Sequence, residues 1–185
     1  MPKIPLPPSE ALYPVPVVLV SSGDKDEANI ITIAWCGVVC SKPPMLSISV
    51  RPGRHSHKII KQKGNFVVNI PREDLLKKCD YCGMVSGSNT NKFKACNFTM
   101  TPSSKISSPM IEECPVNIEC NVIKSLELGA HDIFIGEIVA VHADKDMMSK
   151  DGKIDFEKAR PIVYNHGEYW NLGAKIGYYG FSSKK

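Results

Sequence analysis

The sequence predicts a mainly β protein, an antiparallel barrel of six to seven strands with short helical insertions. Short segments rich in β-branched and aromatic residues recur along the chain, and turn-forming residues separate them. These segments do not alternate regularly with helical ones, which argues against a doubly wound nucleotide-binding sheet. The length of 185 residues and the apolar content of 43% suit a buried core, so residues 1–185 are expected to form a single domain.

The strands are predicted from composition and from the alternation of apolar and polar residues. In the clearest example, Leu46, Ile48 and Val50 point to one face, and the residues between them point to the other. The strands expected on these grounds cover residues 17–21, 29–35, 45–50, 66–70, 116–122 and 133–143, with shorter extended pieces at residues 161–164 and 169–172.

Two helices, a polar loop or short helix over residues 87–94, and an N-terminal arm complete the predicted map. A short helix over residues 57–63 should end at Gly64, because glycine favours the left-handed backbone that closes a helix. A longer helix over residues 71–85 should begin at Pro71, with acidic residues in its first turn. Residues 1–16 are rich in proline, and we expect them to form an extended arm.

The net charge of +4 is small, but the charges are unevenly distributed. The stretch from Ala28 to Arg72 contains no Asp or Glu. Its basic residues are Lys42, Arg51, Arg54, Lys58, Lys61, Lys63 and Arg72, with His55 and His57 among them. An acid-free basic block suggests a site for an anion, and the alternative is a solvated basic face. Charge alone favours the solvated face.

A basic loop follows the third predicted strand, and a helix is expected to begin near Ser56, with that serine as its N-cap. The first turn carries His57 and Lys58 instead of the usual acidic residues. Its free N–H groups are therefore open to an external anion such as a phosphate, and Arg51 and Arg54 could add charge-assisted hydrogen bonds. An ordinary capped helix with a basic flank is the other interpretation, and the residues alone do not separate the two.

Four segments follow one another in a specific order: 29–35 (NIITIAW), 41–45 (SKPPM), 54–60 (RHSHKII) and 64–70 (GNFVVNI). Later segments agree, at residues 86–87 with 92–93, 129–131, and 161–164 with 169–170. This arrangement, over roughly residues 13–178, resembles the flavin reductase-like family and most of all its flavoredoxin and archaeal-type ferric reductase branch. The resemblance implies an FMN-binding Greek-key split barrel.

The resemblance also implies an FMN site with groups for the ring, its polar edge and the phosphate, and it allows a residue near the ring to come from a partner subunit. The expected cofactor-binding residues are Asn29, Thr32 and Trp35 along the isoalloxazine and ribityl chain, Ser49, Val50 and Arg51 with their backbone at the polar edge of the flavin, Arg54, Ser56 and Lys92 at the phosphate, and His131 and Tyr164 near the ring.

The function expected from this resemblance is an NAD(P)H-dependent oxidoreductase that passes electrons through bound FMN to free flavin, ferric complexes or a protein acceptor. The chain contains no G-x-G-x-x-G and no P-loop motif, so a nicotinamide would have to stack on the flavin without a Rossmann domain. Hydride transfer belongs to the cofactor, and we therefore expect no catalytic acid, base or nucleophile in the protein.

Two other functions remain open. A non-enzymatic FMN electron carrier would pass electrons between protein partners, and only the need for a separate reductase would distinguish it. A nucleic-acid-binding barrel would use the basic block, but that stretch offers only Trp35 and Phe66 as aromatic stacking platforms. We therefore expect no nucleic-acid partner.

A homodimer is expected because the family builds its flavin site across two subunits. A lone barrel of this size would also leave a flat ring poorly covered. No stretch approaches the ~20 consecutive apolar residues of a membrane span, and the start of the chain lacks the pattern of a signal peptide. These observations predict a cytoplasmic protein without membrane contact.

The seven cysteines are expected to be reduced thiols. Cys79 and Cys82 form a C-x-x-C pair, but no second pair lies at the spacing of a zinc site. They share one helix face with Leu75, which favours buried thiols over metal ligands, and we expect no bound metal. A redox role for this pair, or for Cys36 and Cys40 near the proposed flavin strand, stays open.

Overall fold

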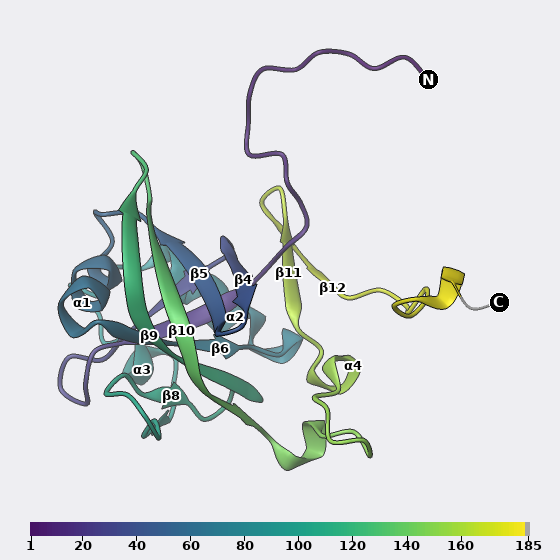
Figure 1. The fold of residues 1–185 in the computed structure, drawn as a ribbon. Coiled ribbons are helices and arrows are strands. Elements are labelled where there is room, and N and C mark those ends of the chain that lie inside the picture. Colours follow the sequence, from purple (N-terminus) through teal and green to yellow (C-terminus); the bar gives the residue numbers. More distant parts are fainter. Residues whose placement is uncertain (184–185) are drawn as a thin grey trace.

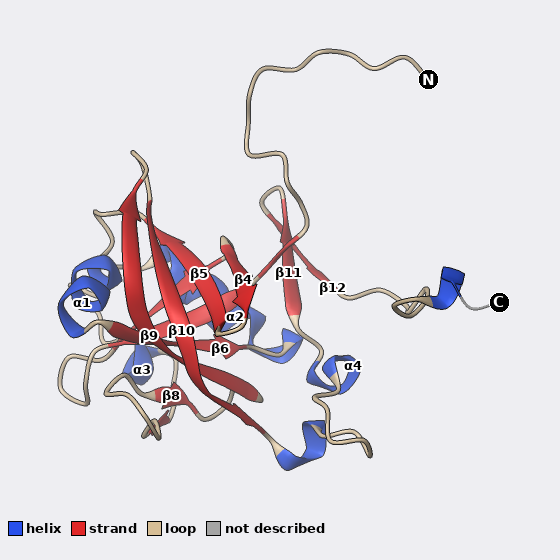
Figure 2. Cartoon of the chain, in the orientation of Figure 1, coloured by secondary structure: helices blue, strands red, loops and turns tan. Residues whose placement is uncertain are grey.

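The computed structural model describes residues 1–183 and shows a mainly β protein with short helices around a curled sheet (Figures 1 and 2). The main sheet is antiparallel and has seven strands in the order β3-β2-β6-β9-β10-β5-β4. The bounds of its strands are β2 Val18–Ser22, β3 Asn29–Ile33, β4 Cys36–Ser41, β5 Pro44–Val50, β6 Asn65–Ile70, β9 Val116–Glu127 and β10 Asp132–Ala143.

The sheet closes into a barrel because its two edge strands, β3 and β4, are consecutive in the chain. The backbone N–H of Ser49 in β5 donates to the carbonyl of Trp35, just after β3, at 2.9 Å. This bond joins the two ends of the sheet. The antiparallel barrel of six to seven strands with short helical insertions is therefore confirmed.

Smaller elements surround the barrel. The helices are α1 His55–Lys63, α2 Leu76–Met84, α3 Lys92–Ala95 and α4 Phe156–Ala159, and 3-10 turns cover Glu73–Leu75, Lys145–Met147 and Phe181–Ser183. A second sheet joins β1 Val15–Pro16, β11 Ile162–Asn165 and β12 Glu168–Asn171, and β7 Met100–Thr101 pairs with β8 Met110–Ile111. Both terminal segments project away from the barrel (Figure 1). Among residues 1–183, every helix is too short or too polar to span a bilayer.

Two apolar cores lie on opposite faces of β2. The first fills the barrel and includes Val18 and Val20, while the second lies under α2 and α3 and includes Val17 and Leu19. The alternation predicted in β5 holds, because Leu46, Ile48 and Val50 are all buried in the barrel core. Strands β2 and β3 are thus covered on both faces. Strand β3 also contacts both α1 and α2.

The prediction that Ser56 caps the first helix is wrong. Helix α1 begins at His55, two residues before the predicted start, and the N-cap is Arg54, whose backbone is extended. The Ser56 hydroxyl accepts a hydrogen bond from the Asn29 side chain at 2.7 Å instead, a long-range contact that no local pattern reveals. The expected end of the helix is confirmed, since Gly64 has φ = 69°.

The helix predicted from Pro71 begins later than expected. The backbone of Arg72 is extended and forms an isolated β-bridge with Pro161, so the chain enters a 3-10 turn at Glu73 and the α-helix only at Leu76. Strand β4 was not predicted, because an edge strand with Val38 and Val39 exposed shows no alternation of buried and exposed positions.

Gly136 in β10 is required by close packing inside the barrel. A Cβ at this position would lie 2.8 Å from both Cys120 Cβ and Phe66 Cζ. We expect Gly136→Ala to lower the free energy of unfolding in urea by about 1.5 kcal/mol, the usual scale for overpacking a core. Gly37→Ala, where a Cβ meets no atom within 4 Å, is the control. Equal stability of the two variants would contradict this packing.

Candidate functional site

All the predicted cofactor-binding residues line two adjoining cavities at the start of α1. The first, here called the wide cavity, has a volume of about 360 Å³, and the second, the narrow cavity, has a volume of about 140 Å³. Ile31 and Arg54 line both cavities. The predicted residues in the wide cavity are Thr32, Trp35, Ser49, Val50, Arg51, Arg54, His131 and Tyr164, and those in the narrow cavity are Asn29, Arg54, Ser56 and Lys92.

The narrow cavity contains a buried ammonium group without an acidic partner. Lys92 is 3% exposed, and its Nζ donates to the carbonyls of Ile30 (2.8 Å) and Cys82 (2.7 Å). No carboxylate in residues 1–183 pairs with it, and burial lowers the pKa of Lys92. An ammonium has three donors, so one remains. A buried charge of this kind is costly unless an anion compensates it, which makes this cavity suited to a phosphate.

The hydroxyl of Ser56 can also donate a hydrogen bond to an anion in the narrow cavity. It is buried and accepts the hydrogen bond from Asn29, so its own proton is left to donate into the cavity. Arg54, at the N-cap, makes no side-chain capping bond, and the first turn of α1 has no acidic residue. The positive end of the helix dipole therefore adds to the charge of Lys92 and Arg54.

Gly87 leaves the space that the Asn29 side chain occupies. A Cβ on Gly87 would lie 2.2 Å from Asn29 Oδ1, so any side chain here would displace the amide that orients Ser56. We expect Gly87→Val to weaken FMN binding roughly 30-fold, equivalent to about 2 kcal/mol. Flavin fluorescence titration measures this, with Gly37→Val as the control in open space. An unchanged affinity in Gly87→Val would show that Asn29 does not organise the cavity.

A buried pair ties α1 to the start of β10. His57 Nε2 lies 2.7 Å from Asp132 Oδ2, and both side chains are shielded from solvent. The pair fixes the first turn of α1 against the residue that follows His131. The positions of the narrow and wide cavities relative to each other are therefore fixed.

Aromatic side chains form the walls of the wide cavity. The rings of Trp35 and His131 are 4.5 Å apart between centroids, and Arg51 Nε donates to His131 Nε2 at 3.3 Å. Burial, together with the charge of Arg51, lowers the pKa of His131. The imidazole is thus neutral at pH 7, and a ring that accepts at Nε2 carries its proton on Nδ1. Flat walls with a few polar groups suit a planar heteroaromatic ring.

Thr32 contributes less to the cavity through its side chain than expected. The Thr32 hydroxyl donates to the Cys79 carbonyl and so anchors α2. The backbone N–H of Ser49 is used by Trp35, and the side chain of Val50 is buried in the barrel core. A backbone contact to the flavin is expected in this segment, but the main-chain N–H of Ser49 is not free to make it.

Sequence reasoning missed Glu10 and Tyr13, which reach the wide cavity from the N-terminal arm. The Tyr13 ring lies 4.1 Å from the His166 ring and 6.0 Å from that of Tyr164, so the β11–β12 hairpin positions it. Nothing local to a proline-rich arm indicates such a contact. The glycines at 53, 83 and 87 in the narrow cavity were also missed as lining residues.

The cysteines beside the site are buried thiols, as predicted for Cys79 and Cys82. Cys82 Sγ lies 3.7 Å from Cys96 Sγ in the second core. Burial raises the pKa of Cys79 to about 12 and that of Cys36 to about 12, which keeps both as unreactive thiols. Within residues 1–183, no group of three or more His, Cys, Asp or Glu side chains is arranged to hold a metal.

Native-state alkylation tests the low reactivity of these thiols. Iodoacetamide at pH 8 is expected to modify Cys40, which is partly exposed, long before Cys79 or Cys82. Peptide mass spectrometry over time gives the order, and protein unfolded in guanidinium supplies the reference rate for each thiol. A Cys79 that reacts as fast as Cys40 would revive a redox role for the pair.

Comparison with known proteins agrees with this geometry. The model of the flavin reductase like domain matches residues 10–173. The chain belongs to the flavin reductase-like family. This flavin reductase-like protein is 38% identical over 147 residues to an uncharacterized protein of Archaeoglobus fulgidus, covering 79% of this chain and 81% of the relative.

Two solved structures of flavoredoxins are similar to this flavin reductase-like protein over nearly its whole length. Flavoredoxin of Desulfovibrio vulgaris (Miyazaki F) is 32% identical with a TM-score of 0.91, covering 98% of this chain and 100% of that one. Flavoredoxin from Methanosarcina acetivorans is also 32% identical, with a TM-score of 0.90 and full coverage of both chains. The resemblance noted in the sequence is confirmed, and the fold is that of the split-barrel flavoproteins.

Proposed function

We propose that this protein is an FMN-dependent oxidoreductase of the flavin reductase type, which passes electrons from NAD(P)H to free flavin, a ferric complex or a protein acceptor. The observation that carries the proposal is the buried Lys92 ammonium, which has no carboxylate partner among residues 1–183 and lies in a cavity that Arg54 and Ser56 also line. The adjoining wide cavity has the aromatic walls that a flavin ring needs.

The residues present fit FMN. Lys92, Arg54 and Ser56 would bind the phosphate, since they offer two cations and a free hydroxyl proton. Trp35 and His131 would enclose the ring and exclude water from it. Bound FMN supplies the group that takes up hydride from a nicotinamide. His131, whose pKa burial and the charge of Arg51 both lower, would hold a proton on Nδ1 beside this ring, and Arg51 orients the imidazole.

A non-enzymatic FMN electron carrier is the second candidate, and the similarity to two flavoredoxins favours it. In that case the same cavities would bind FMN, but a separate reductase would load the electrons. Steady-state oxidation of NADH and NADPH distinguishes the two functions, because a carrier oxidises neither without its partner.

We also propose a homodimer, supported by two terminal segments that project from the barrel (Figure 1) and by the apolar side chains that they expose to solvent. The exposed residues are Ile4, Leu6, Leu12, Leu172, Ile176, Tyr179 and Phe181. A second copy would cover them and the open side of the wide cavity. Light scattering at micromolar concentration should report twice the mass of one chain, and a monomer would contradict the proposal.

Two further proposals concern the chain as a whole. We propose that it works as a single domain, because β2 contributes to both cores and so joins them. We propose a cytoplasmic location, because all seven cysteines are free thiols, which suits a reducing compartment. Fractionation of cells with antibody detection would place the protein, and recovery from an oxidising compartment would contradict this.

The experiment for the proposed function is an anaerobic titration. Purified protein is first saturated with FMN, with fluorescence quenching as the measure of binding. NADH or NADPH is then added while the flavin spectrum is recorded. We expect FMN to bind and its absorbance to bleach with one of the two nicotinamides. A protein that binds no FMN would contradict the cofactor, and bound FMN that neither nicotinamide bleaches would favour the carrier.

A further inference from the structure

Two thiols touch each other in the second core, beside the narrow cavity. Cys82 Sγ, on α2, lies 3.7 Å from the Sγ of Cys96, the residue that ends α3. The sulfur atoms of a disulfide are about 2.0 Å apart, so an approach of roughly 1.7 Å would join the two. Helix α3 has only four residues. A small movement of this single turn is therefore enough to bring the two thiols to bonding distance.

The two cysteines stand at the two ends of one segment, residues 83–95, here called the 83–95 loop. This loop supplies five of the eleven residues that line the narrow cavity. They are Gly83, Val85, Ser86, Gly87 and Lys92. Because Cys82 and Cys96 are 14 positions apart, a disulfide between them would close a ring that contains this whole side of the cavity.

The 83–95 loop has few polar attachments to the rest of the molecule. Lys92 Nζ donates to the carbonyl of Ile30 in β3 at 2.8 Å, and within residues 1–183 this is the only hydrogen bond from residues 85–95 to the barrel. None of the ion pairs in the described part of the chain involves the loop. The loop is therefore held mainly by apolar packing, through the buried ring of Phe93.

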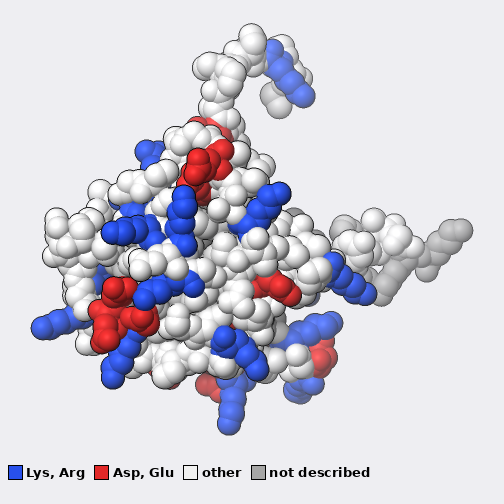
Figure 3. All heavy atoms as spheres, turned by 60° about the vertical axis from the view of Figure 1, so that its left-hand side comes forward, with Lys and Arg blue, Asp and Glu red and all other residues white. Residues whose placement is uncertain are grey.

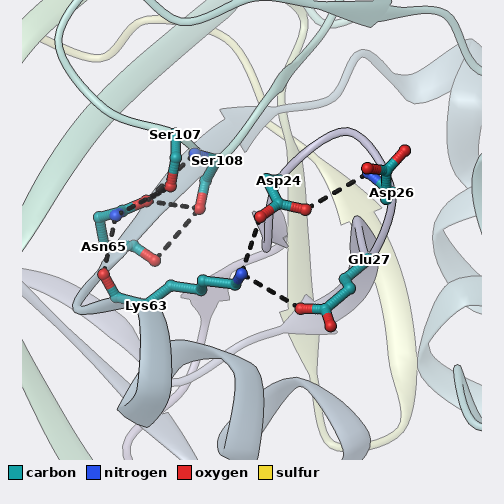
Figure 4. A network of polar contacts seen from close by, with 7 residues as sticks. All are labelled: Asp24, Asp26, Glu27, Lys63, Asn65, Ser107 and Ser108. Atoms are coloured by element: carbon teal, nitrogen blue, oxygen red, sulfur yellow. Dashed lines mark hydrogen bonds and ion pairs between the residues drawn. The ribbon is translucent and has the colours of Figure 1, made fainter.

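Two neighbouring loops are held by polar side chains, as Figure 4 shows. Lys63 Nζ, at the end of α1, holds the loop before β3 through Asp24 Oδ2 at 2.7 Å. Asn65 Oδ1 accepts from the backbone N–H of Ser108 at 3.1 Å and so holds the loop before β8. The 83–95 loop has no comparable side-chain pair, so a covalent bond between its ends would restrict it more than these contacts restrict its neighbours.

Cys96, and not Cys79, is the partner of Cys82 that the contacts indicate. Cys79 is also buried in the second core and shares the C-x-x-C pair with Cys82. The contact between Cys82 and Cys96 is nevertheless the only hydrogen-bonding contact between two thiols in residues 1–183. A disulfide within the C-x-x-C pair would also lie inside α2 and would leave the 83–95 loop as free as before.

We propose that Cys82 and Cys96 form a reversible disulfide that cross-links the ends of the 83–95 loop, with a low-molecular-weight disulfide as the oxidant. The cross-link restricts the opening of the loop and so slows the release of FMN, whereas the dithiol form lets FMN exchange. The effect on FMN rests on the proposed function, and the disulfide itself does not.

The reaction starts at Cys96, which is 7% exposed, because Cys82 is fully buried and burial raises the pKa of its thiol. The Cys96 thiolate attacks the small disulfide, and one small thiolate leaves. Cys82 then attacks the Cys96 sulfur of this mixed disulfide, the second small thiolate leaves, and the bond between Cys82 and Cys96 forms. The two protein thiols lose two electrons and two protons, and the small disulfide gains both as it becomes two thiols.

Positive charge near Cys96 favours an anionic disulfide such as that of glutathione. Lys94 is exposed two residues before Cys96, and Lys78 Nζ donates to the carbonyl of Asn97, the next residue. Basic side chains are also spread over the face that α1 presents, with a smaller acidic group among them (Figure 3). Glutathione disulfide is therefore the probe for the test.

For this test the full chain is incubated overnight at pH 8 in glutathione buffers that range from reducing to oxidising. Peptide mass spectrometry should find a link between Cys82 and Cys96 whose fraction rises with the share of glutathione disulfide, and dithiothreitol should reverse it. We expect the oxidised chain without flavin to melt about 6 °C higher, the usual scale for closing a loop of this length in a protein of this size. The release of bound FMN should slow roughly fivefold.

Two alanine variants form a matched pair for this experiment. Cys96→Ala removes the proposed bond, and Cys79→Ala removes a neighbouring thiol that is buried in the same core. Oxidation should change neither the melting temperature nor the release of FMN in Cys96→Ala, and it should change both in Cys79→Ala as in the wild type. Each comparison is made between the oxidised and reduced forms of one variant, so the packing that either substitution removes does not affect the result.

The outcomes separate the disulfide from the flavin site. Cys82 and Cys96 that stay unlinked in the most oxidising buffer, or that link to other cysteines, would overturn the inference and leave the proposed function untouched. A disulfide that forms but leaves FMN release unchanged, or speeds it, would contradict the restriction of the loop. A wild-type chain that binds no FMN would contradict the proposed function, while the linked peptide and the higher melting temperature would still confirm the disulfide.

Discussion

Replacing Lys92 by methionine is expected to raise the dissociation constant for FMN roughly 100-fold, equivalent to about 2.7 kcal/mol. The side chain keeps its length, but the cavity loses its buried ammonium and the charge-assisted hydrogen bond that this group would donate to a phosphate. Fluorescence titration of FMN measures the effect.

Lys94→Met is the matched control, because Lys94 lies on the same short helix with its side chain in solvent. It should bind FMN as the wild type does. Stability without flavin is measured in parallel, where we expect only a small change for Lys92→Met, since the loss of two hydrogen bonds offsets the relief of a desolvated charge. Equal FMN affinity in the two methionine variants would exclude Lys92 from the phosphate site.

The same lysine predicts how binding depends on pH. Burial lowers the pKa of Lys92, and a phosphate beside it would raise that pKa again. FMN binding should therefore take up a proton, and its affinity should fall as the pH rises through the lowered pKa. Without flavin, the pKa of Lys92 is lower in the folded chain than in the unfolded chain, so the unfolded chain binds the proton more strongly. The free energy of unfolding should therefore rise with pH over the same range. Lys92→Met should lose both dependences.

The barrel was predictable because half-buried strands leave a period of two in the sequence. In β5, Leu46, Ile48 and Val50 fill the core, and this alternation alone identifies the strand. Strand β4 gave no such signal, since it pairs at the edge and exposes Val38 and Val39. The alternation of apolar and polar residues reveals a strand only where one of its faces is buried. An exposed edge strand is determined by the strand it pairs with, which the local sequence does not show.

The candidate site was predictable only in part, for a related reason. The acid-free block pointed to an anion site, yet Lys63 and Arg72 in that block are paired with acids that lie outside it. Arg54 and Lys92 are the two cations that line the narrow cavity, and only the fold reveals which ones these are. The bond between Asn29 and Ser56 also spans 27 positions, beyond any local rule for helix capping.

The second large effect is expected when Arg54 and Ser56 are both replaced by alanine. This variant loses the N-cap cation and the hydroxyl that Asn29 orients, while the aromatic walls of the wide cavity, Trp35 and His131, stay intact. Two such contacts to a phosphate amount to about 3 kcal/mol, so FMN should bind at least roughly 100-fold more weakly. Riboflavin has the same ring and no phosphate, so its affinity should be unchanged.

The ratio of FMN to riboflavin affinity, measured by fluorescence titration in the wild type and in this double variant, is therefore the most direct measurement of phosphate binding at the start of α1. We predict a strong preference for FMN in the wild type and its near-complete loss in the variant. An FMN affinity that survives the double replacement, or an equal loss for FMN and riboflavin, would contradict the assignment of this cavity.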